Sequence, residues 1–388
     1  MAAAKEINEV RAVSDWLTNV GIWLVSRSTV LLTFIVVLLL VVRNGLRFSS
    51  WEPSISEAMV ALPSAINYNS SAIIPMGLAK FIPNDLIDGP LVTLIPQLLT
   101  IGLLLLITGR SVARQLEILD RRIGVLIAVL AVALSPMVTI LLGSGGFARD
   151  WIPILGLAGF AIFSRPAYAF IGLGFAALGN PEQALVAVLI LAIASYSPQL
   201  IGFRKRALSG LVLAFLIFLP IQIWEKLSGS ESRAIFLVHN LRRTLGAFLP
   251  DAYVAVYASL AASWVVVVIW IVVARKFGRV WPVVASLCVG YLMMAVTTDG
   301  TRVFSIIITP LLLVLIVQFS VRAAQRNEAM PPRPNNLGKL VVAFIAVLGV
   351  LMPAATWAVH GGLPATSALS SLKSTISDLA RNKLHGAP

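Results

Sequence analysis

Cysteine, histidine and charged residues are all scarce in this sequence. Its single cysteine, Cys288, stands in an apolar run, so no disulfide can form within the chain. The three histidines are scattered and show no metal-ligand spacing. Charged residues make up 12% of the 388 residues, about half the share that is usual in soluble domains. These shortages exclude a secreted disulfide scaffold and a soluble enzyme, and they make a zinc enzyme a poor candidate.

Hydrophobic residues dominate the chain instead. They supply 58% of it, and the mean hydropathy is +0.91. A soluble fold could not cover that much apolar surface with the few polar residues present. The sequence therefore predicts an all-α, polytopic transmembrane helical bundle of about 11 spans. The expected spans are residues 29–43, 90–108, 123–142, 151–164, 166–178, 184–199, 207–225, 253–274, 280–297, 303–321 and 340–358.

The formal net charge of +13 would suggest nucleic acid in a soluble chain. In a membrane protein, cytoplasmic loops collect Lys and Arg, and this explains most of the charge without any nucleic-acid partner. The short links 109–122, 204–206 and 275–279 are strongly basic. They place the N-terminus in the cytoplasm and the C-terminus outside. Because the loops are short, we expect a bacterial inner membrane.

The spans divide the chain into one transmembrane domain over residues 1–388, with four peripheral segments. Residues 1–28 are expected to form a cytoplasmic interfacial helix. Residues 44–89 form the longest outer loop, which should carry amphipathic surface helices. The Pro-rich segment 322–339 is a cytoplasmic linker, and 359–388 is an outer tail. No cleavable signal peptide is expected, because the first twenty residues are rich in charge.

Carboxylates gather on the predicted outer side. Glu52 and Glu57 stand in the first outer loop, and Arg149 and Asp150 follow a glycine-rich outer turn. A carboxylate at such a surface can act as a general base on a hydroxyl group, or bind a metal ion that does so. A solvated or helix-capping role is the alternative for each of them.

Two further groups on this side could bind an anion. Arg302 follows Asp299 in an outer turn, and its planar guanidinium matches phosphate oxygens. Asp299 could orient Arg302, and a local Asp–Arg pair is the plainer alternative. His239, Arg242 and Arg243 lie in another outer segment, where they could bind phosphate or form a basic patch near lipid headgroups.

This layout resembles the GT-C superfamily of membrane glycosyltransferases. A first span is followed by a long outer loop with an early carboxylate, Glu52 or Glu57, and by a stretch from Pro75 to Lys80. A second outer turn then supplies Asp150. The resemblance covers about the first half of the chain. The Asp299–Arg302 turn is a second, weaker point of resemblance.

The resemblance implies an activity and a set of roles. Such enzymes move a sugar from a polyprenyl-phosphate carrier to a glycan, lipid or protein acceptor at the extracytoplasmic face of the bilayer. By analogy with the aminoarabinose-transferase branch, Glu52 would be the base or metal-linked carboxylate, and Lys80 would bind the carrier phosphate. Asp150 would be the partner acid. A divalent metal ion is a possible cofactor.

Three rival functions fit the same composition. A polymerase or ligase of lipid-linked glycans would centre on His239, Arg242 and Arg243. A transporter or flippase would need ionisable groups or broken helices within the membrane, whereas the middles of the expected spans are almost free of charge. A structural subunit of a cell-envelope complex would need neither.

Overall fold

The computed structural model describes residues 28–44, 90–142, 150–227, 233–275 and 278–325, together with 341, 342, 344 and 345. Within these ranges the chain forms twelve α-helices, one 3-10 helix and no strand, which confirms the predicted all-α class. The helices are α2 Thr29–Asn44, α6 Pro90–Ala113, α7 Ile118–Ala133, α8 Pro136–Leu142, α9 Trp151–Ile162, α10 Pro166–Gly179, α11 Pro181–Ala194, η1 Pro198–Phe203, α12 Arg204–Leu227, α13 Arg233–Leu260, α14 Ser263–Arg275, α15 Trp281–Val296 and α16 Gly300–Gln325.

Most of the expected peripheral segments lie outside the described residues. This holds for the interfacial helix within 1–28, the outer loop 44–89 and the outer tail 359–388. Residues 322–325 of the expected cytoplasmic linker belong to α16, and the rest of that linker lies outside the described residues.

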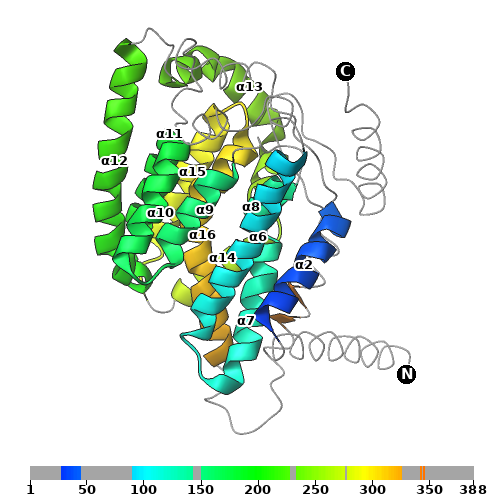
Figure 1. Ribbon diagram of the computed structural model, residues 1–388. Helices are drawn as coiled ribbons and strands as arrows, with labels where there is room; N and C mark the ends of the chain where they lie inside the picture. Colours follow the sequence, from blue (N-terminus) through cyan, green and yellow to red (C-terminus); the bar gives the residue numbers. More distant parts are fainter. Residues whose placement is uncertain are drawn as a thin grey trace.

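Helix α16 lies at the centre of the described bundle (Figure 1). Its most apolar stretch is 94% buried, and its main neighbours are α7, α9, α11 and α15. A helix that is apolar on every side must be covered on every side. The composition of α16 therefore explains why the other helices surround it.

Three of the described helices are long and apolar enough to cross a membrane, and up to five spans result if each bent helix pair counts as one. These helices indicate an integral membrane protein in a lipid bilayer. The predicted count of about 11 spans is not confirmed. Shorter apolar helices occupy five of the expected positions, namely α2, α9, α10, α11 and α15.

Two predicted spans are wrong as continuous helices. The span expected at 123–142 is bent by 53° between α7 and α8, where Pro136 starts the second helix. The span expected at 253–274 is bent by 83° between α13 and α14, and Ala261 at the bend has a φ of 44°. The span expected at 184–199 also ends early, at Ala194, before the 3-10 helix η1.

Charge separates the two ends of the bundle. One end, which we call the basic end, carries the cations at the end of α6, α9, α14 and α16 and at the start of α7, α10, α12 and α15. It is tied together by Arg206 of α12, which donates to the carbonyls of Phe160 and Ser164 at 3.3 Å. Its described cations are Arg110, Arg114, Arg121, Arg122, Arg165, Arg204, Lys205, Arg206, Arg275, Arg279 and Arg322.

The opposite end, which we call the acidic end, carries carboxylates from four helices. Asp150 and Asp299 precede α9 and α16, Glu182 lies in the first turn of α11, and Glu225 lies near the end of α12. Cations such as Arg43, Lys226 and Arg302 also lie at this end, so the described carboxylates and cations are mixed there, whereas the basic end carries mainly cations.

Helices α9 and α10 approach each other at two glycines. A Cβ atom added to Gly172 would lie 2.8 Å from the Gly156 carbonyl oxygen, and one added to Gly156 would lie 2.5 Å from the Gly172 carbonyl oxygen. Small residues allow this kind of backbone contact between membrane helices. The α9–α10 pair therefore depends on the absence of both side chains.

We expect Gly172→Ala to destabilise the protein by about 1–3 kcal/mol, because the new methyl group must push two helix backbones apart. The matched control is Gly174→Ala on the same helix, where a Cβ atom would meet nothing within 4 Å. This control should gain about 0.5–1 kcal/mol from helix propensity. Thermal unfolding of the detergent-solubilised variants measures both effects, and equal melting temperatures would contradict the close approach.

Candidate functional site

A buried ion pair joins two turns that are far apart in the sequence. The Nε and Nη2 atoms of Arg302 donate to the Oδ2 and Oδ1 atoms of Asp150 at 2.6 and 2.8 Å. Arg302 is 7% exposed and Asp150 is 2% exposed. This is the two-pronged geometry in which a guanidinium holds a carboxylate most firmly. The pair therefore ties the start of α9 to the start of α16 across 152 positions of sequence.

A second carboxylate approaches the same guanidinium. Nη1 of Arg302 donates to Oδ2 of Asp299 at 3.0 Å, and the side chain of Asp299 is 38% exposed. Two carboxylates thus face one cation, and the three groups carry a net charge of −1. Asp299 is the member of this cluster that water or a ligand can reach.

The backbone explains why the two carboxylates stand where they do. Asp150 and Asp299 each occupy the position before the first residue of a helix, α9 and α16 respectively. The N-terminus of a helix carries a partial positive charge, which favours a carboxylate there. The side chain of Asp150 nevertheless forms no capping hydrogen bond, because Arg302 takes both of its oxygens. The helix-capping role considered for the Asp150 side chain is therefore wrong.

The remaining predicted site residues fall into two groups. His239, Arg242 and Arg243 lie on α13, where all three side chains are exposed. Glu52, Glu57, Lys80 and Arg149 lie outside the described residues. The structure thus brings together Asp150, Asp299 and Arg302 from the predicted set.

Sequence reasoning missed a second polar cluster at the acidic end. The Nε2 atom of Gln222 donates to Oε2 of Glu225 at 2.8 Å and to Oε1 of Glu182 at 3.2 Å. Glu225 is completely buried, and an ionisable residue inside an apolar span is the signal that could have found it. Asn180, rather than the nearby Glu182, caps α11 by accepting from the Gln183 amide at 3.2 Å.

No group of three or more potential metal ligands occurs among the residues that the structure describes. In the Asp150–Arg302–Asp299 cluster, two carboxylates are oriented by one arginine. Such a cluster can hold one carboxylate rigidly while the other accepts a proton or a hydrogen bond from a ligand.

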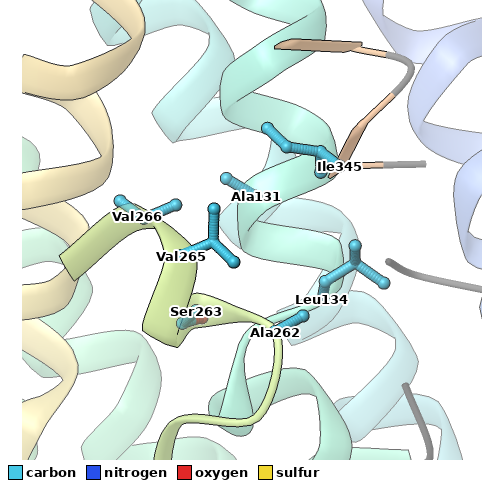
Figure 2. A pocket seen from close by; sticks show the side chains of 7 residues that line it. All are labelled: Ala131, Leu134, Ala262, Ser263, Val265, Val266 and Ile345. Atoms are coloured by element: carbon cyan, nitrogen blue, oxygen red, sulfur yellow. The ribbon is translucent and has the colours of Figure 1, made fainter. Parts of the chain in front are cut away.

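A small pocket lies where the two bent helix pairs meet. It is lined by Ala131 and Leu134 at the end of α7, by Ala262 and Ser263 at the bend before α14, and by Ile345 from the segment near the C-terminus (Figure 2). The hydroxyl oxygen of Ser263 is buried and forms no hydrogen bond with a described residue. The pocket is otherwise apolar and contains none of the predicted site residues.

Comparison with known proteins assigns no family to the chain. No family model matches it, and no significant match to a curated protein or a solved structure is found.

We expect Asp150→Asn to destabilise the protein by about 3–5 kcal/mol, because it removes one partner of a buried ion pair. Asp299→Asn should cost far less, because that side chain is partly exposed. The double variant Asp150→Asn/Arg302→Gln should recover part of the loss, because no unpaired charge then remains buried. Thermal unfolding in detergent tests this order. A loss from Asp299→Asn as large as that from Asp150→Asn would refute it.

Proposed function

We propose that this protein is a membrane glycosyltransferase of the GT-C type. It would transfer a sugar from a polyprenyl-phosphate carrier to a glycan, lipid or protein acceptor at the extracytoplasmic face of a bacterial inner membrane. One observation carries the proposal. Two carboxylates from turns about 150 residues apart meet on Arg302 at the acidic end of the bundle. The GT-C resemblance implies a lipid-linked donor on this side.

Asp299 is the proposed base in this reaction. Its carboxylate is the accessible member of the cluster, so it can accept the proton of the acceptor hydroxyl. The hydroxyl oxygen then forms the new bond to the anomeric carbon of the sugar. The bond from that carbon to the carrier phosphate breaks, and the phosphate leaves with the bonding electrons.

Arg302 is assigned as a positioning residue rather than as the phosphate ligand. Its Nε, Nη1 and Nη2 atoms all donate to carboxylates in the described structure. With its two carboxylates the Arg302 cluster carries a net charge of −1, which disfavours a further anion, so another cation is proposed for the carrier phosphate. Lys80 and Arg149 are the candidates that the sequence supplies. Glu52 and Glu57 remain candidates for a second carboxylate, or for binding a divalent metal ion.

The first test measures carrier release. Protein reconstituted in lipid nanodiscs is incubated with polyprenyl-phosphate-linked sugars and membrane extract, and free polyprenyl phosphate is quantified by mass spectrometry. We expect Asp299→Asn to lower the rate of release about 10²–10⁴-fold, which is the usual contribution of a general base. A parallel sample with a chelator tests the need for a metal ion.

The matched control is Glu117→Gln, which changes an exposed carboxylate at the basic end and should keep the full rate. If wild-type protein releases no carrier phosphate from any donor, the glycosyltransferase proposal fails. If Asp299→Asn and wild type release it equally, the assignment of the base fails.

A second candidate function is lipid or solute transport, and a specific observation favours it. Both bent helix pairs contribute residues to the pocket in Figure 2, and discontinuous helices are typical of transporter binding sites. In the nanodisc assay a transporter would leave the donor intact. In sealed vesicles it would move a fluorescent polyprenyl-phosphate sugar between leaflets without cleaving it.

A further inference from the structure

Helix α13 has an exposed apolar stripe along its length. Val238, Leu249 and Tyr253 are 70%, 70% and 77% exposed. At about 100° of rotation per residue, these positions fall on one side of the helix. Thr244 and Ala255 are fully buried and fall on the opposite side, against the bundle. The stripe is thus an exposed, mainly apolar side of α13 between Val238 and Tyr253, on which Arg242 also lies.

Two arginines, which we call the basic edge, accompany this stripe. Arg242 and Arg243 are both exposed. The helical rotation places Arg242 on the same side as the apolar side chains and Arg243 about 80–140° further around the helix. Among the described residues, neither guanidinium pairs with a carboxylate. An apolar stripe with a cationic border is the composition of a helix that lies in the headgroup layer of a bilayer.

The bend before α14 sets the orientation of α13 relative to α14. The two helices meet at 83°, so α13 would lie close to the membrane plane if α14 is aligned with the bilayer normal. Two contacts fix the bend. Trp264 Nε1 donates to the Val256 carbonyl at 3.0 Å, and the Ser259 and Tyr291 hydroxyls lie 3.0 Å apart. In Figure 1, α13 lies across the end of the bundle at which α12 ends and α16 begins.

We infer that α13 is an interfacial helix that binds anionic phospholipid. Its stripe enters the acyl region of the leaflet at the acidic end, and Arg242 and Arg243 attract the phosphates of the headgroups. Charge complementarity selects anionic lipid as the occupant, since each arginine near an anionic surface adds about 1 kcal/mol of attraction. This surface is separate from the Asp299 site, so the inference stands or falls independently of the proposed function.

The depth of the stripe can be measured with a single fluorescent label. The only cysteine is first removed as Cys288→Ser, and an NBD group is then attached at Leu249→Cys or, as the matched control, at Pro250→Cys. Pro250 is also exposed, but it lies about 100° further around the helix. In nanodiscs containing doxyl-labelled acyl chains, we expect strong quenching at position 249 and weak quenching at 250. Equal quenching at the two positions would overturn the interfacial placement.

The basic edge is tested by lipid selectivity. Native mass spectrometry of protein from nanodiscs with equal phosphatidylglycerol and phosphatidylcholine gives the ratio of the two bound lipids. We expect Arg242→Gln/Arg243→Gln to lower this ratio about fivefold for each arginine lost, and Arg242→Lys/Arg243→Lys to preserve it. An unchanged ratio in the Gln variant would overturn the inference. A loss in the Lys variant as well would show a dedicated guanidinium–phosphate site, such as one for a carrier phosphate, and would also overturn it.

Discussion

The described structure depends on the complete burial of one helix. Helix α16 is apolar along nearly its whole length, and 94% of its central stretch is covered by protein. Packing inside a membrane gains little from the hydrophobic effect, because lipid is as apolar as the side chains. The bundle must instead gain its stability from close contacts. These include the glycine approach between α9 and α10, and Phe304 of α16 stacked on Tyr291 at 4.8 Å.

Burial of α16 also determines which groups must surround the arginine in its first turn. Arg302 lies in the first turn of this helix, where water is largely excluded. A buried guanidinium without partners would be very costly, so two carboxylates accompany it. The need to neutralise this guanidinium also determines where the two carboxylates lie. It fixes Asp150 and leaves Asp299 at the boundary with solvent, and this difference in exposure underlies the different roles assigned to them.

The sequence predicted the helical class and the approximate position of most helices, because long apolar runs and charged links are local signals. It could not predict that 253–274 bends by 83°, since an Ala-Ala pair carries no breaking signal of the kind that Pro136 gives. It singled out Asp150, Asp299 and Arg302 separately. The pairing of Asp150 with Arg302 was beyond it, because that contact is set by how α9 and α16 pack. Glu225 was missed because a single carboxylate near the end of an apolar helix does not reveal in the sequence that it faces Gln222.

The separation of Asp150 from Arg302 has a consequence for biosynthesis. Ribosomes add about 5–20 residues each second, so the 152 positions between the partners correspond to roughly 8–30 s of synthesis. During that interval α9 has already left the ribosome while the arginine that neutralises its carboxylate does not yet exist. In the nascent bundle Asp150 therefore lacks the guanidinium that holds it in the finished structure until α16 has been made. The last described long helix thus supplies the partner that completes an early one.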